Sequence, residues 1–183
     1  MKNRRIILYI FCTLLIASCA VDEQCRTNRT VLLGFGIYHV SYNDSTKLFT
    51  TTSESIDSIT IKGLELDTLT GKYTYVDSIL YNNTKAISAF YVPLHSFVTS
   101  STFEITFNTK VIKSKNDTLK FFNTKDTLTV LHENINDYLS LECGCIKVHS
   151  IDTAIVTHNF IDSIKIINHT VNNVNAENIK IYK

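Results

Sequence analysis

The sequence predicts an all-β protein, a single antiparallel β-sandwich that is immunoglobulin-like or related. Three observations predict this fold class. Thr, Ser, Asn and β-branched aliphatic residues dominate the composition, while proline occurs once in 183 residues, which favours strands and turns. Short segments of alternating apolar and polar residues recur between turn signals. No segment shows a long helical period, and no connection is long enough for the crossover helices of a parallel sheet.

The first 19 residues have the features of a bacterial lipoprotein signal. Three basic residues among the first five precede an apolar run over residues 6–16. That run has the length of a signal-peptide core and is too short to span a bilayer. It ends in Ile16-Ala17-Ser18-Cys19, which resembles the bacterial lipobox. We therefore expect residues 1–18 to form a signal-peptide helix that is removed, and Cys19 to carry the anchoring acyl groups, palmitate among them.

The chain that remains after cleavage has the size of one domain. It has 165 residues, with 15 basic against 17 acidic side chains, a net charge of −2. This balance gives no electrostatic reason to expect nucleic acid as a partner. We expect a lipidated tether at 19–29 and one β-sandwich domain at 30–183.

The elements follow from turn signals and alternation. Thr30–Ser41 is the first expected strand, in which Gly34 and Gly36 indicate a bulge or a close approach of another backbone. Residues 42–54 are expected to be a polar loop, and Leu94–Val98 the only helical turn. Further strands are expected at Ser58–Lys62, Tyr73–Leu80, Ala86–Pro93, Thr102–Asn108, Thr118–Phe122, Thr127–His132, Tyr138–Val148, Ala154–His158, Asp162–Ile167 and Asn178–Tyr182. The turn signals between them are Thr70-Gly71, Asn82-Asn83, Lys115-Asn116-Asp117, Asn136-Asp137 and Asn172-Asn173.

Cysteine usage suits an oxidising compartment. Cys12 leaves with the signal peptide and Cys19 is acylated, so three cysteines remain. Cys25–Cys143 is the preferred bridge and Cys25–Cys145 the alternative, because sequence alone does not fix the connectivity. A Cys143–Cys145 bridge is disfavoured, since alternate residues of a strand lie too far apart. We expect the remaining thiol to be buried.

Several dispersed landmarks carry a resemblance to a known family. They are an acidic residue before Cys25, the strand Val31–Tyr38, Tyr91-Val92-Pro93-Leu94 before Phe97, Tyr138-Leu139-Ser140-Leu141-Glu142-Cys143-Gly144, and Ile179-Lys180-Ile181-Tyr182. With them the chain resembles a family of uncharacterised lipoproteins common in Bacteroidetes, classed as a domain of unknown function. The chain departs from the family at Glu142, where alanine is usual, and at Cys145, where the family usually lacks a cysteine. The resemblance implies one β domain and a Cys25–Cys143 pair, and it brings no activity.

Eight of the ten aspartates are followed by Ser or Thr and then by Ala, Ile, Leu or Thr, although composition predicts roughly one such triplet. One explanation is strand syntax: Asp caps a turn, the hydroxyl residue starts a strand and the aliphatic residue enters the core. The other is modification, since the triplet resembles the O-glycosylation motif of exported proteins in Bacteroides-type bacteria. The hydroxyl acceptors are Ser45, Ser58, Thr68, Ser78, Thr118, Thr127, Thr153 and Ser163.

Motifs that carry chemistry are missing from the sequence. Cys143-Gly144-Cys145 with His149 lacks a second ligand cluster, so we expect no metal. There is no Gly-x-Ser-x-Gly, no phosphate loop and no paired-carboxylate motif. We therefore expect no cofactor and no enzymatic activity.

These observations lead us to expect a non-enzymatic lipoprotein of the cell envelope, anchored in the outer membrane through its lipid, that binds an envelope protein or a glycan. A subunit of a surface or fimbrial-type assembly is one alternative, because a terminal strand can pair with a neighbour's sheet edge. An envelope hydrolase with a site formed only in space is another. The membrane face stays open, although Asp22-Glu23 resembles the acidic surface-export signal of such lipoproteins.

Overall fold

The computed structural model describes residues 29–111, 120–141 and 143–183. The expected signal-peptide helix and most of the tether, with Cys19 and Cys25, lie outside the described residues. All regular structure in the described residues is β-strand, which confirms the predicted fold class. Leu94–Val98 contains bends from Ser96 onward and no helical turn, so that expectation was wrong.

The strands of the described residues are β1 (Leu33–Asn43), β2 (Leu48–Ser53), β3 (Ile56–Asp67), β4 (Lys72–Ile87), β5 (Ala89–Val92), β6 (Ser100–Val111), β7 (Lys120–Ser140), β8 (Gly144–Val156), β9 (Ser163–Ile166), β10 (Thr170–Val171) and β11 (Glu177–Tyr182).

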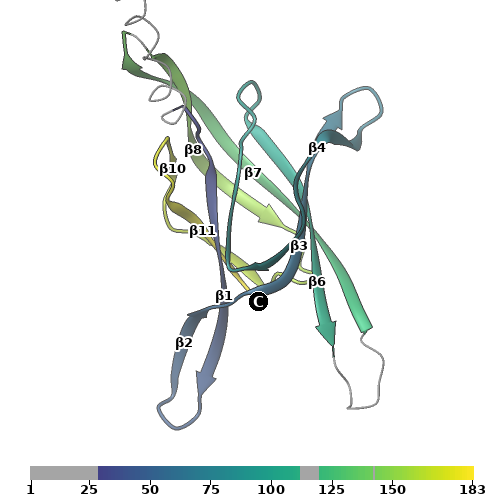
Figure 1. The fold of residues 1–183 in the computed structure, drawn as a ribbon. Helices are drawn as coiled ribbons and strands as arrows, with labels where there is room; N and C mark the ends of the chain where they lie inside the picture. The colour runs from purple at the N-terminus through teal and green to yellow at the C-terminus, as the bar shows by residue number, and fades with distance from the viewer. Residues whose placement is uncertain (1–28, 112–119, 142) are drawn as a thin grey trace, which may run out of the picture.

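The strands form two sheets that face each other without closing into a barrel (Figure 1). The first sheet has the order β2-β1-β11-β9, and β5 also pairs with β1. The second has the order β10-β8-β7-β6-β3-β4. Apolar residues of both sheets are buried in one cluster, among them Phe35, Ile37 and Ile179 from the first and Ile59 and Ile105 from the second. The predicted sandwich is therefore confirmed.

One strand pair departs from the antiparallel arrangement. β1 and β11 run parallel, with Phe35 beside Ile179 and Ile37 beside Ile181. The other pairs of the described strands are antiparallel. A parallel pair needs a long connection. β1 and β11 meet this need because they are the first and last of these strands, so most of the fold connects them.

The glycines of β1 behave as the sequence predicts. The register shifts between Gly34 and Phe35. A Cβ at Gly34 would collide with the carbonyl oxygen of Ala176, and one at Gly36 with the carboxylate of Glu177. The neighbouring backbone therefore approaches closely at Gly34, which only glycine permits, whereas Gly36 leaves room for the side chain of Glu177.

Strand boundaries depart from the prediction at two hairpins. Residues 42–54 are not a polar loop, because β2 occupies Leu48–Ser53 and pairs with β1. All of β2 is exposed, so burial gave no periodic signal there. The second hairpin joins β7 to β8: its turn includes Leu141 and Cys143 and does not lie at Asn136-Asp137, which pairs within the strand. Gly144, with a φ of 70°, supplies the left-handed conformation that closes it.

Two further predictions of strand boundaries were wrong for the same reason. Thr127–His132 is not a separate strand, because it lies inside the 21-residue β7 together with the end of the expected Thr118–Phe122 strand. The expected strand Tyr138–Val148 contains the β7–β8 turn. The ends of long hairpin strands cannot be predicted from apolar alternation, because their exposed residues show no alternation between buried and exposed positions.

Several loops gather at the end of the sandwich where the chain enters β1, which we call the tether end. Leu33 pairs with Val92, so the 93–99 loop begins at this end. Leu64 pairs with Thr102, which brings the β3–β4 turn to the start of β6. The β7–β8 turn lies beyond the same end, because β7 continues past the start of β6. Figure 1 shows these loops pointing the same way, opposite to the β1–β2 hairpin.

Candidate functional site

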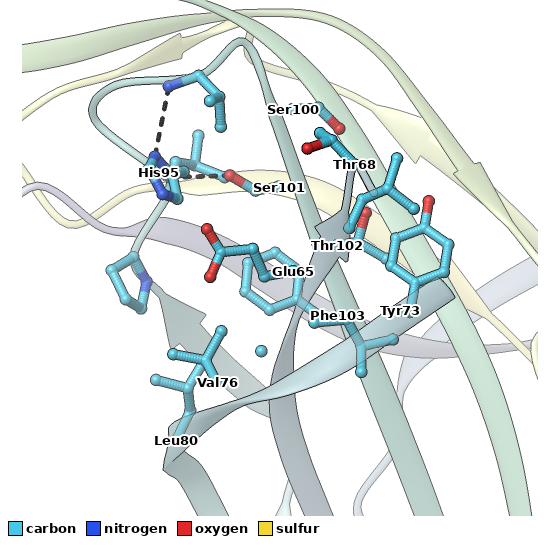
Figure 2. Close-up of a pocket in the computed structure, with 16 residues that line it drawn as sticks. Glu65, Thr68, Tyr73, Val76, Leu80, His95, Ser100, Ser101, Thr102 and Phe103 are labelled. Atoms are coloured by element: carbon cyan, nitrogen blue, oxygen red, sulfur yellow. Dashed lines mark hydrogen bonds between the residues drawn. The ribbon is translucent and has the colours of Figure 1, made fainter. Parts of the chain in front are cut away.

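A groove of about 540 Å³ lies at the tether end, between the β3–β4 hairpin, the 93–99 loop and the start of β6 (Figure 2). Its apolar lining consists of Leu64, Leu66, Val76, Leu80, Pro93, Leu94, Val98 and Phe103. The polar groups at its surface include Glu65, His95 and Ser101. A groove of this size and character is typical of a binding site for a small or extended apolar group.

The shape of the β3–β4 hairpin creates the open side of the groove. Register shifts occur between Ile59 and Ile61, between Ile61 and Lys62, and between Lys62 and Leu64. Such bulges bend and twist a strand. Asn83 and Ala86 on β4 also have positive φ angles. The hairpin therefore projects beyond the sandwich, and Val76 stays 43% exposed.

A buried chain of hydrogen bonds stands behind the groove wall. Ser101 Oγ lies 2.9 Å from His132 Nε2, and His132 Nδ1 lies 3.1 Å from Asn134 Oδ1. The same Asn134 oxygen lies 2.7 Å from His149 Nδ1. Side-chain hydrogen bonds thus connect residues of β6, β7 and β8.

Asn134 fixes the direction of every bond in this chain. Its Nδ2 donates to the carbonyl of Val98 at 2.8 Å, so its Oδ1 faces both histidines as an acceptor. Both histidines must then carry their proton on Nδ1. The free Nε2 of His132 accepts from the Ser101 hydroxyl, while Ser101 Oγ accepts from the backbone N–H of His95 at 2.8 Å.

Burial keeps the two histidines neutral. Removal from water lowers the pKa of His132, against a smaller opposing effect of its bond to Asn134. Burial lowers the pKa of His149 further, to about 4, with the nearby His132 and Lys147 adding to the effect. Near neutral pH both rings are therefore uncharged.

Ser101, His132 and Asn134 repeat the order of groups found in serine nucleophile sites, where an imidazole takes the hydroxyl proton. Three features favour a structural role instead. Ser101 is only 7% exposed, and its oxygen already accepts from His95. His132 is 1% exposed, and its lowered pKa makes it a weaker base at neutral pH. These hydrogen-bonded side chains hold the 93–99 loop against the second sheet, because Ser101 bonds to His95 and Asn134 bonds to Val98. The loop forms one wall of the groove.

Sequence reasoning missed this chain of residues. Ser101, His132, Asn134 and His149 belong to three strands, and no short motif contains them. Only His132 and Asn134 are close in sequence, and their spacing is that of any two residues on one strand face. Strand pairing alone brings the four together.

A second, polar hollow of about 680 Å³ lies on the face of the second sheet that points away from the core. Its groups bond mostly to each other. Lys125 pairs with Glu104 at 3.0 Å, and the Tyr75 hydroxyl donates to the same carboxylate at 2.9 Å. These bonds to Glu104 raise the pKa of both Tyr75 and Lys125. Asn108 donates to Ser58 and to Asn83.

The cysteine predictions are partly resolved. Cys145 is free and exposed, which excludes the alternative Cys25–Cys145 bridge and contradicts the expectation that the remaining thiol is buried. Cys145 sits beside the β7–β8 turn, where a side chain finds no cover. Cys143 stays the candidate partner of Cys25, which lies outside the described residues, so this pair remains a prediction.

The hydroxyl groups of the aspartate triplets differ in access. Ser45, Thr68, Thr153 and Ser163 are exposed, and Thr127 is half-buried. Ser58 is buried and accepts a hydrogen bond from Asn108 Nδ2 at 3.1 Å, which makes it a poor acceptor for a glycan. The side chains of Ser78 and Thr118 are outside the described part of the chain.

Turn capping by aspartate at the start of a strand explains some of these triplets. Asp67 caps its turn by accepting from the Leu69 N–H and the Thr70 hydroxyl, and these bonds lower its pKa. At Asp44 the expected cap is supplied instead by the preceding Asn43, which accepts from two backbone N–H groups.

In the described ranges, no group of three or more His, Cys, Asp or Glu side chains is placed to hold a metal ion. Among those same residues, no helix is long and apolar enough to cross a bilayer.

Comparison with known proteins places the chain in a family. A family model described as a family of unknown function (DUF6452) matches residues 68–183, which is more than half of the chain. No curated protein and no solved structure matches significantly. The match includes most of the groove and all four residues of the buried hydrogen-bond chain from Ser101 to His149, and it starts after Cys19 and Cys25. The chain belongs to the family of unknown function DUF6452.

Proposed function

We propose that this chain is a lipid-anchored protein of the cell envelope, held in the outer membrane through Cys19, and that its sandwich binds a partner and catalyses no reaction. The groove at the tether end supports the proposal. It is lined mainly by apolar side chains, yet Leu66 and Val76 stay 49% and 43% exposed. Apolar surface left open in a hollow costs free energy unless a ligand covers it.

The edge of the second sheet indicates the kind of partner. β4 is the last strand in the order of that sheet, and Tyr73, Val76 and Leu80 on it line the groove. An extended peptide added beside β4 would pair with its backbone and direct alternate side chains into the groove. The proposed ligand is therefore an extended segment with apolar side chains in another envelope protein.

A charge in the groove tests this function. We expect Val76→Glu to abolish co-purification of the partner from native membranes, because a carboxylate on the groove wall cannot be covered by apolar side chains. Ile155→Glu is the matched control, since Ile155 is 59% exposed and lies on β8, away from the groove. Equal recovery of the partner with both variants would contradict the proposal. A fatty acid or glycan retained by the wild type and lost with Val76→Glu, seen by native mass spectrometry, would identify a different ligand.

The anchor and the glycans are tested together by the intact mass of protein from native membranes. We expect loss of residues 1–18 and the added mass of acyl groups on Cys19. Sugar increments would show that glycans are attached, which we expect at exposed acceptors such as Thr68 and Ser163. An unmodified Cys19 would contradict the anchor, and a single peak at the mass of the unglycosylated lipoprotein would contradict glycosylation.

Hydrolysis is a second candidate function, because Ser101, His132 and Asn134 are linked in the order of a serine nucleophile site. A fluorophosphonate probe reacts with an activated serine, and Ser101→Ala identifies the site. Labelling that depends on Ser101 would support a hydrolase, whereas an unlabelled protein supports the structural role argued above.

A further inference from the structure

We propose that the tether end of the sandwich docks on the lipid bilayer, with three loop tips inserted at the membrane surface. The inference rests on the proposed anchor at Cys19. The tips are Leu69 in the β3–β4 turn, Phe97 in the 93–99 loop and Leu141 in the β7–β8 turn. They are 95%, 89% and 96% exposed, which makes them the most exposed large apolar side chains of the described residues.

The three tips lie at one end although they are far apart in sequence. The β3–β4 turn and the 93–99 loop both lie beside the start of β6, because Leu64 pairs with Thr102 and the loop leads directly into Ser100. β7 pairs with β6 up to Leu131 and then continues outward to the turn that holds Leu141. In Figure 1 the loops that carry the three tips lie toward the same end of the sandwich.

Partly exposed side chains of interfacial character lie behind the tips. Tyr73 follows the β3–β4 turn and is 52% exposed, and Tyr138 precedes the β7–β8 turn and is 59% exposed. Val98, next to Phe97, is 49% exposed. Tyrosine is enriched where a protein crosses from the apolar membrane interior to the headgroups. An apolar tip followed by a tyrosine therefore matches the layers of a bilayer surface.

The length of the tether keeps this end near the membrane. Ten residues lead from Cys19 to Arg29, where the described chain begins. Even fully extended they reach about 35 Å. Three apolar side chains bind a membrane weakly by themselves, but a short tether raises their effective concentration at the surface. Docking then needs no cluster of basic residues, and the charges near the tips are mixed: Asp67 and Lys72 flank the β3–β4 turn.

The opposite end provides an internal control. Phe49 on the β1–β2 hairpin is 72% exposed and packs on Tyr42 at 4.9 Å between ring centroids. This apolar pair has chemistry similar to that of the tips, but it belongs to the β1–β2 hairpin, which points away from the tether end. Membrane docking of the tether end predicts that Phe49 stays in water.

Single tryptophans test the inference, since the chain has no natural one. Leu69→Trp, Phe97→Trp, Leu141→Trp and the control Phe49→Trp would be made in the full lipidated protein. Each would be reconstituted in phosphatidylcholine vesicles with and without bromine on the acyl chains. We expect emission at the three tip positions to shift to shorter wavelength and to lose intensity with the brominated lipid. Emission at position 49 should not change.

Mass spectrometry of the same preparations separates the two ways to fail. If Cys19 carries no acyl groups, the proposed anchor fails and this inference fails with it. If Cys19 is acylated and bromine quenches the tips no more than position 49, docking alone is overturned. Quenching confined to position 49 would also overturn it, because the molecule would then lie the other way round.

Discussion

At the scale of single residues, Asn134 determines which ring nitrogen of His132 and of His149 carries a proton. A single amide oxygen accepts from two buried imidazoles, and the amide cannot turn over because its Nδ2 is bonded to Val98. The bond that His132 Nε2 accepts from the Ser101 hydroxyl exists only while His132 is neutral. The structure behind the groove wall therefore depends on pH.

This dependence gives the first prediction. The pKa of His149 is about 4 in the folded protein and near 6.5 in an unfolded chain. Between these values the unfolded state binds more protons than the folded state, so acid favours unfolding. The contribution of His149 to the free energy of unfolding is fully present above about pH 6.5. The free energy of unfolding should fall by about 3 kcal/mol as the pH approaches about 4. Urea unfolding at several pH values measures it.

The controls for the pH prediction are two histidine variants. His149→Gln should lose much of the fall in stability, since the residue that titrates is gone. His39→Gln should keep the fall in stability, because His39 is exposed on β1 and lies away from the buried histidines. An unchanged fall in His149→Gln would show that other groups cause it.

At the scale of elements, β1 is the strand on which the first sheet depends. It pairs with β2 and β5 along one edge and with β11 along the other. The close approach at Gly34 allows the parallel pair. The Gly34 N–H also donates to the buried side chain of Asn178 at 3.1 Å, and Asn178 donates to the carbonyls of Asn168 and Thr170.

A methyl group at this approach gives the second prediction. Gly34→Ala should lower the free energy of unfolding by about 3 kcal/mol, because the new Cβ meets the backbone oxygen of Ala176, which cannot move without disturbing β11. Gly63→Ala is the control. Its Cβ would lie 3.4 Å from Val76 Cγ2, an exposed side chain that can shift, so we expect a change below about 1 kcal/mol. Chemical denaturation followed by circular dichroism compares the two, and equal losses would refute the argument.

At the scale of the whole molecule, Asp126 holds the segment that passes from one sheet to the other. It lies on β7, is 1% exposed, and accepts from the backbone N–H groups of Asn159, Phe160 and Ile161 and from the Thr157 hydroxyl. This segment connects β8 of the second sheet with β9 of the first. Phe160 within it stacks on the core residue Phe107, with ring centroids 4.3 Å apart.

Removal of this carboxylate gives the third prediction. Asp126→Ala should destabilise the fold by about 3 kcal/mol or more, because three backbone donors lose their acceptor and a cavity opens beside them. Asp152→Ala, in a triplet of the same kind but exposed, should change stability by less than about 0.5 kcal/mol. Hydrogen exchange at Phe160 and Ile161 should accelerate in the first variant only. Unchanged protection there would mean that the segment is held by its packing and not by Asp126.

The sequence alone determined the all-β class and many of the strand cores. Alternation and turn residues act locally, so the bounds of β6, β9 and β11 could be predicted to within a few residues. Gly34 on β1 likewise indicated the close approach of another backbone. The sequence did not predict β2 or the ends of β7 and β8, because the exposed residues of these hairpin strands show no alternation between buried and exposed positions.

Tertiary structure decided everything that joins distant strands. It paired the first strand with the last in parallel, and it brought Ser101 to His132 and His149 behind the groove. It also assigned different tasks to triplets with the same sequence: Asp67 caps a turn, while Asp126 clamps the crossing between the sheets. A local pattern states what a residue can bond, but strand register determines which partner comes within reach.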